Sequence, residues 1–241
     1  MPPFIRTLLQ AIIGLSLVGV IWLIAAIVLD DPIRLPMPGA ALAKAIELAT
    51  SEDYFRHIEE SGTALVLGLG PALIAGVLLG ILARMSSGMR WLIGPFAITL
   101  AAAPLVALVP AFVLWWGLTI TTKAVAVFVV ALFASMNMVM VSAGARRHYA
   151  ARPDEERVPV KAEGGGTARA IFCGLRIGVA FGVTALIVCE FMASTRGVGY
   201  FIMNSASTFD TTSMMAGVIL VVVPTVLVVA LLQAIEEQIA V

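Results

Sequence analysis

Long runs of apolar residues, separated by short polar stretches, dominate the pattern of the chain. Six runs have about the twenty residues that a helix needs to cross the hydrocarbon core of a bilayer. They are approximately 11–29, 61–83, 92–115, 124–143, 174–193 and 213–232. The two-residue alternation of membrane β-barrels is absent from the sequence. The pattern therefore predicts an all-α membrane protein with six transmembrane helices, in which residues 1–241 form a single domain.

Composition supports the membrane prediction. Hydrophobic residues make up 61% of the 241 residues and charged residues only 12%, with a mean hydropathy of +1.04. A soluble domain of this composition would expose more apolar surface than water tolerates. The formal net charge is zero, which argues against a surface for nucleic acid. Membrane lipid is therefore an expected partner, and nucleic acid is not.

The distribution of positive charge predicts the orientation. If the N-terminus is cytoplasmic, ten of the fifteen Lys and Arg residues lie on the inner side and five on the outer side. The excess of positive charge belongs on the cytoplasmic side, so both termini are predicted to be cytoplasmic. Seven of the ten lie between Arg146 and Arg176. The loop at about 144–173 is therefore predicted to be cytoplasmic and to bind a cytoplasmic partner.

Glycines recur at four-residue spacing in two of the predicted spans. Gly76 and Gly80 form a GxxxG motif in the second span, and Gly174, Gly178 and Gly182 extend the same spacing in the fifth. Small residues at this spacing let a neighbouring helix approach closely. These five glycines are predicted to lie at helix-packing contacts.

Enzyme chemistry finds little support in the sequence. The glycine triplet at 164–166 is not followed by the GKS or GKT of an ATP-binding loop, and HExxH and GxSxG motifs are absent. The two histidines, His57 and His148, are predicted to lie on opposite sides of the membrane, so they cannot share a metal ion. We therefore expect no enzyme activity, no catalytic residue, no metal site and no cofactor in this chain.

Polar residues at membrane depth are candidates for a transport path or gate. Asn137 in the fourth span needs a hydrogen-bond partner or a wet cavity. Pro104 and Pro110 interrupt the third span, and broken helices often border a transport path. Simple kinked packing of that span is an equal alternative.

Glu190 is the carboxylate found inside a predicted span. It must face a partner or water, because a charge facing lipid is costly. In one interpretation it lines the outer end of the path. In the favoured one it accepts hydrogen bonds from the glycine-rich segment Ser194–Gly199, with Arg196 nearby, and holds that segment as part of an outer gate. Ser194 and Arg196 are therefore further candidates for the path or gate.

Four stretches resemble permease subunits of bacterial ABC importers of the nitrate, sulfonate, taurine and bicarbonate type. They are LPMPGAALA, AAAPLVALVPAFVLWWG, GLRIGVAFGVTALIVCEFMASTRGVGYFI and FDTTSMMAGVIL. The resemblance implies the six-helix permease fold of type I importers and a multi-pass location in the bacterial cytoplasmic membrane. It also implies a second permease subunit, ABC ATPase subunits that bind ATP and Mg, and an extracytoplasmic binding protein that delivers a small solute.

The loop between the fourth and fifth spans departs from this family. Family members have a coupling helix there with the pattern EAA, three residues, then G. If Gly166 is that glycine, Val160 stands where the glutamate belongs, followed by Lys161 and Ala162. Pro159 and three consecutive glycines also disfavour a helix. The predicted coupling residues are Lys161, Ala162, Glu163, Gly164, Gly165, Gly166, Thr167 and Arg169.

Two hypotheses follow from this degenerate motif. In the favoured one, the chain is half of a permease heterodimer whose partner keeps the full motif. In the other, which allows a homodimer, the loop docks on an acidic ATPase surface through its arginines. A third hypothesis, of a different class, is a non-conducting membrane scaffold or regulatory subunit derived from such a permease.

Overall fold

The computed structural model describes residues 3–102, 105–142 and 166–239 of the chain. These residues form helices and connecting turns and contain no strand, which confirms the all-α prediction. The helices are α1 (Pro3–Leu29), α2 (Pro38–Ala49), α3 (Glu52–Met85), α4 (Ser87–Ala102), the 3-10 helix η1 (Leu105–Leu108), α5 (Val109–Trp116), α6 (Ile120–Val141), α8 (Gly166–Met192), α9 (Val198–Ser207) and α10 (Thr211–Ile239).

Five helices of the described residues are long and apolar enough to cross a membrane, namely α1, α3, α6, α8 and α10. They correspond to five of the six predicted spans. The third predicted span, 92–115, is instead divided among α4, η1 and α5. Pro110 lies in the first turn of α5, because proline lacks the N–H that would continue a preceding helix. Pro104 lies outside the described residues, and a membrane crossing at 92–115 stays a prediction.

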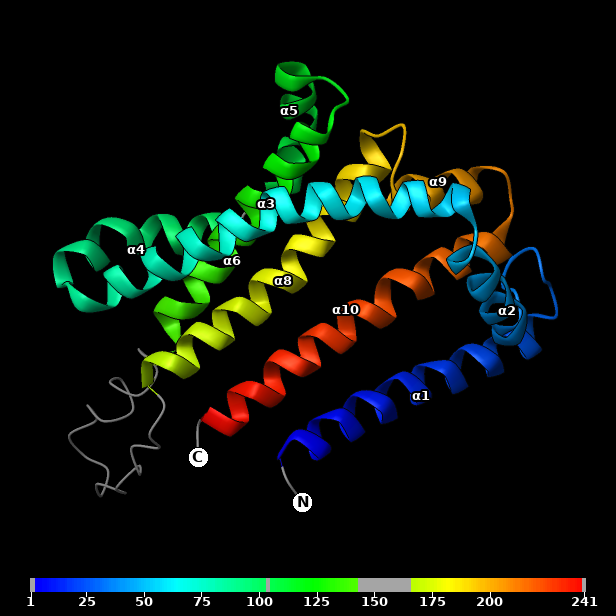
Figure 1. Cartoon of the computed structure of the whole chain (residues 1–241), viewed down its shortest axis with the longest axis horizontal. Helices are drawn as coiled ribbons and strands as arrows, with labels where there is room; N and C mark the ends of the chain where they lie inside the picture. The colour runs from blue at the N-terminus through cyan, green and yellow to red at the C-terminus, as the bar shows by residue number, and fades with distance from the viewer. Residues whose placement is uncertain (1–2, 103–104, 143–165, 240–241) are drawn as a thin grey trace.

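The long helices form a layered arrangement around α6. Helix α6 packs between α3 and α8, α10 packs on α8, and α1 lies beside α10 (Figure 1). The first turns of α1, the last turns of α10 and the start of α8 lie toward one side of the molecule (Figure 1). Helices α2 and α9 pack against α10 at the other end. These two ends are the predicted inner and outer ends.

The predicted glycine positions lie where α3 and α8 contact α6. A Cβ atom added to Gly76 would lie 2.8 Å from Leu132 O, and one added to Gly80 would lie 2.7 Å from Val139 Cβ. From α8, a Cβ on Gly178 would lie 3.1 Å from Ser135 Cβ of α6 and would overlap the Leu73 side chain of α3. A Cβ on Gly174 would overlap the Val139 side chain, and one on Gly182 would lie 3.4 Å from Ala131 Cβ. The glycines of α3 and α8 therefore let both helices approach α6 closely, and those of α8 also pack against α3.

The short helix α2 follows the first span at the predicted outer end. Its buried residues are Ala41, Ala45 and Leu48. Leu42 and Ile46, which recur at helical spacing, are exposed in the isolated chain. Ala41, Ala45 and Leu48 thus pack α2 onto the bundle. Leu42 and Ile46 on its exposed face are free to contact lipid, as in an interfacial helix.

Two polar caps fix helix starts at the predicted outer end. Ser51 Oγ accepts a hydrogen bond from Tyr54 N–H at the start of α3, the usual role of a serine at this position. Before α10, Asp210 Oδ1 accepts a hydrogen bond from Ser213 N–H at 3.0 Å. Hydrogen bonds from Ser213 hold the pKa of Asp210 below its usual value.

The predicted orientation can be tested with single cysteines. Thr167 and Ser207 are both exposed, at opposite ends of the bundle. In a chain without Cys173 and Cys189, a cysteine at Ser207 is expected to react with an impermeant maleimide in intact cells. A cysteine at Thr167 is expected to react only after the membrane is permeabilised. Labelling of position 167 in intact cells would show that the orientation is wrong.

Candidate functional site

The turn between α8 and α9 is fixed by side chains rather than by other backbone groups. Within residues 194–199, four consecutive residues each give one backbone group to a side chain from another part of the chain. Lys123 Nζ donates to Arg196 O at 2.5 Å, Gly197 N–H donates to His57 Nδ1 at 3.1 Å, Val198 N–H donates to Ser61 Oγ at 2.8 Å, and Gly199 N–H donates to Glu190 Oε2 at 2.7 Å. We call these four side chains and the turn the anchoring network.

Three helices supply the anchoring network. His57 and Ser61 lie four residues apart on α3, so they share one face of that helix. Lys123 lies in the first turn of α6 and Glu190 in the last turn of α8. The close glycine contacts of α3 and α8 with α6 bring these ends together. The turn is therefore docked on all three packed helices at once.

Lys123 and Glu190 place two opposite charges in the interior of the network. Lys123 is 1% exposed and Glu190 is also 1% exposed. Lys123 Nζ lies 2.7 Å from Glu60 Oε1 and 3.5 Å from Glu190 Oε1. Ser61 Oγ–H donates to Glu190 Oε1 at 2.7 Å. Buried charges are tolerated when they are paired and hydrogen-bonded, and both conditions are met here.

The turn needs glycine at two of its positions. Gly197 has φ +127°, a conformation that residues with a side chain rarely adopt. A Cβ at Gly197 would overlap the carboxyl group of Glu190, and one at Gly199 would lie 2.8 Å from Glu190 Cβ. The carboxylate can reach the turn only because these two residues have no side chain.

Aromatic rings cover the network beside His57. The His57 ring stacks on Tyr200, with centroids 6.1 Å apart, and it also contacts Tyr54 and Phe201. Tyr54 is 2% exposed, and its hydroxyl has no hydrogen-bond partner among the described residues. These rings pack around the His57 side chain of the network.

The structure brings together some of the predicted gate residues and not others. The hypothesis that Glu190 accepts a hydrogen bond from the glycine-rich segment is confirmed by its bond with Gly199. Ser194 and Arg196 belong to the same turn, where Arg196 N–H donates to Ser194 Oγ at 3.2 Å and Arg196 O accepts from Lys123. Asn137 lies on α6 about 21 Å from Lys123, at about 1.5 Å of rise per residue, and its buried Oδ1 has no partner among the described residues.

Three members of the network do not stand out as site residues in the sequence. In the sequence, Lys123 is one of five outer positive charges, His57 is a histidine too far from His148 to share a metal ion, and Ser61 is the first residue of the second apolar run. The spacing of His57 and Ser61 indicates a shared polar face at the end of a span, and a lysine beside an apolar run needs a buried partner. These two signals point to the network. Among the described residues, no group of three or more His, Cys, Asp or Glu side chains is arranged to hold a metal ion.

Charged residues also join α8 to α10 at the predicted inner end. Arg169 Nε lies 3.4 Å from Glu236 Oε1, and an Arg176 guanidinium nitrogen lies 3.5 Å from Glu236 Oε2. Arg84 donates to Gly166 O at 3.4 Å. Of the predicted coupling residues, Gly166, Thr167 and Arg169 thus belong to the first turn of α8, and residues 161–165 lie outside the described residues.

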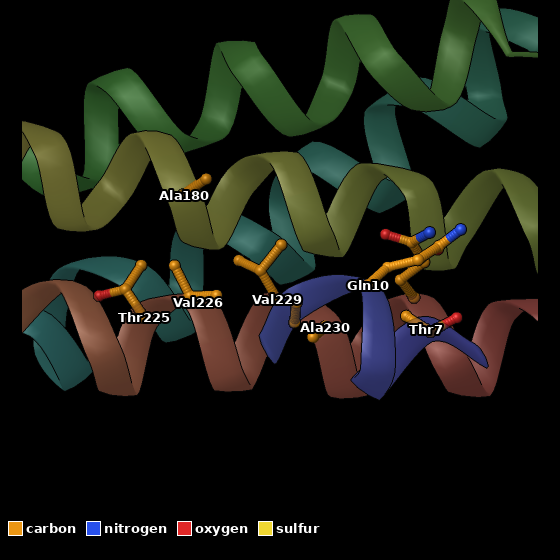
Figure 2. A pocket seen from close by; sticks show the side chains of 9 residues that line it. Thr7, Gln10, Ala180, Thr225, Val226, Val229 and Ala230 are labelled. Atoms are coloured by element: carbon orange, nitrogen blue, oxygen red, sulfur yellow. The ribbon is translucent and has the colours of Figure 1, made fainter. Parts of the chain in front are cut away.

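A separate cavity of about 450 Å³ lies between α1, α8 and α10. Figure 2 shows Thr7 and Gln10 of α1 at one end of this cavity and Thr225 of α10 at the other. Its walls between them are formed by small and apolar residues such as Ala180 and Val229. The cavity contains none of the four residues predicted for the path or gate.

Comparisons with known proteins show what the chain is similar to. No family model matches it. It is 26% identical to the taurine transport system permease protein TauC of Escherichia coli, over 92% of this chain and 85% of the relative. It is 27% identical to the formylaminopyrimidine transport permease protein ThiX of Halalkalibacterium halodurans, over 79% of this chain and 78% of the relative. It is 29% identical to the putative aliphatic sulfonates transport permease protein SsuC of Bacillus subtilis, over 77% and 70%.

These similarities extend over most of each protein. The relatives are permease subunits of ABC importers, which work with ATPase and binding-protein subunits and are not themselves enzymes. These similarities support a permease subunit of an ABC importer of the nitrate, sulfonate and taurine type and a location in the bacterial cytoplasmic membrane.

Proposed function

We propose that this permease moves a small solute as one half of a heterodimer whose partner subunit keeps the full coupling motif. The observation on which the heterodimer rests is Val160, which occupies the place of the coupling glutamate in the register set by Gly166. A homodimer with this sequence would lack the glutamate in both copies. ATP and Mg would be bound by the ATPase subunits.

The names of the relatives indicate a small polar solute. Taurine, formylaminopyrimidine and aliphatic sulfonates, which their names mention, are small and contain polar groups. The buried cation Lys123, at the predicted outer end, is already paired with Glu60 and Glu190. It is therefore not available to select an anion. The small solute therefore rests on the names of the relatives, and the network does not assign its charge.

At the inner end, the start of α8 is suited to transmit a movement of the ATPase. Arg169 and Arg176 bind Glu236 near the end of α10, so a displacement of α8 would also move α10. At the other end of the same helix, Glu190 holds the 194–199 turn. In this proposal α8 connects the ATPase side to an outer gate formed by that turn.

The heterodimer can be tested by changing the coupling element of each permease subunit in turn. Replacing the motif glutamate of the partner subunit is expected to abolish ATP-driven uptake of the ligand of the cognate binding protein. Replacing Glu163 of this chain by alanine is expected to leave most uptake, because the motif here is already incomplete. Both variants are compared at equal amounts of assembled complex.

Each contrary outcome has a defined meaning. Equal loss of uptake from both changes would contradict the asymmetric heterodimer. If the chain assembles with a complete importer that transports equally well without it, the non-conducting scaffold is the correct function instead.

A further inference from the structure

Lys123 is the single charged residue of α6, and it is buried in the first turn of that helix. Three oxygen atoms surround its ammonium group, Glu60 Oε1, Glu190 Oε1 and Arg196 O. An ammonium group has three protons to donate and no acceptor capacity. All of its hydrogen-bonding capacity is therefore directed at the two carboxylates and the turn.

Removing this charge would affect Glu190 more than Glu60. The Glu60 side chain is 25% exposed and can be solvated, whereas the Glu190 side chain is fully buried. A buried carboxylate without a counter-ion takes up a proton or moves toward water. Either change disturbs its acceptance of hydrogen bonds from Ser61 and Gly199, and with it the docking of the turn.

We propose that Lys123 is a positioning residue of this permease: its charge balances Glu190, and the pair together keeps the 194–199 turn docked on α3, α6 and α8. The role of this docking in transport rests on the proposed gate function of the turn. The docking itself does not depend on that function. Lys123 contacts the turn directly at Arg196 O. It also acts on the end of the turn at Gly199, through Glu190.

The rate at which the turn opens can be measured with a cysteine at Val198. Val198 is 7% exposed and belongs to the turn. Native Cys173, which is buried at the opposite end of α8, is kept as an internal reference for general unfolding. The assembled complex is placed in lipid nanodiscs, where both faces are accessible, and treated with a maleimide. Peptide mass spectrometry then gives the labelling rate of each cysteine.

In the Lys123→Met variant, labelling at position 198 is expected to be faster by about tenfold or more, the factor that the loss of one charged hydrogen bond typically gives. Labelling of Cys173 is expected to stay unchanged. In Lys123→Met/Glu190→Gln, the rate at position 198 is expected to return toward that of the parent. The neutral amide of the double variant needs no counter-ion, and it still offers an oxygen to Gly199 N–H.

Lys44→Met provides a matched control. Lys44 also pairs with a carboxylate at the predicted outer end, Glu47 at 2.6 Å, but its side chain is 31% exposed and it contacts no part of the turn. This variant is expected to label like the parent.

The proposal is overturned if Lys123→Met labels position 198 at the parental rate, or if adding Glu190→Gln brings no slowing. Should Lys123→Met fail to accumulate, the same comparison is made on the amount of folded protein. Recovery by Glu190→Gln supports the charge balance, and no recovery contradicts it. The labelling experiment needs no transported solute. A negative result there contradicts the role of Lys123, whereas a negative result in the uptake assay contradicts the proposed function.

Discussion

Replacing Gly197 by alanine is expected to remove most of the folded, assembled permease. The backbone at Gly197 has φ +127°, and holding a residue with a side chain in such a conformation costs about 1–3 kcal/mol. The new methyl group would in addition overlap the Glu190 carboxyl group. The carboxylate must then leave its place between Ser61, Gly199 and Lys123, so the strain and the loss of the buried bonds add. Size-exclusion chromatography of the solubilised complex measures the remaining folded fraction.

Gly117 offers a control with the same kind of backbone but open space. Its φ is +71°, and a Cβ atom added there would have Thr119 Cγ2 at 4.0 Å as its nearest neighbour. Gly117→Ala therefore reports the backbone strain alone and is expected to leave most of the protein folded. If the two variants behave alike, the carboxylate does not make the contact with the turn on which the anchoring network depends.

The packing of the spanning helices is the part of the structure that sequence patterns predict well. Glycines at four-residue spacing, such as Gly76 and Gly80, lie at close contacts because only the absence of a side chain allows a neighbouring backbone to approach. The pattern does not say which helix approaches. That α6 is the common neighbour of α3 and α8 depends on residues without a marked pattern, such as Ala131 and Ser135.

The third predicted span shows where hydropathy is an insufficient guide. Residues 92–115 are apolar throughout, but the described part of this region is divided between α4, η1 and α5. Hydropathy measures the transfer of side chains into lipid, whereas the continuity of a helix also depends on backbone hydrogen bonds, which proline interrupts. The prolines are visible in the sequence. The apolar pattern alone, however, does not show that the helix is divided in this region.

Of the anchoring network, only the contact between Glu190 and the glycine-rich turn is predictable from the sequence. Glu190 can be identified because a carboxylate in an apolar run needs a partner, and the nearby glycines offer backbone N–H groups. Its other partners come from positions far away in the sequence, Ser61 and Lys123, and only the packing of three helices brings them together. Sequence spacing contains no information on such contacts between helices.

Replacing Glu190 by alanine is expected to lower both assembly and uptake, whereas Glu190→Gln is expected to retain most of both. Alanine leaves the Gly199 N–H and the Ser61 hydroxyl without their acceptor and breaks a buried ion pair, and the loss of one partner of such a pair costs about 3–5 kcal/mol. Glutamine keeps the shape and one acceptor oxygen, and Lys123 keeps Glu60 as its counter-ion at 2.7 Å.

The comparison of these two variants distinguishes an anchor from a charge in the transport path. If Glu190 serves as an anchor, uptake per assembled complex follows the docking of the turn, and glutamine largely replaces glutamate. If instead the negative charge itself acts on the solute, glutamine removes uptake as completely as alanine does while assembly stays intact. That result would contradict the structural role of Glu190, because the hydrogen bonds of Glu190 with Ser61 and Gly199 do not require its full charge.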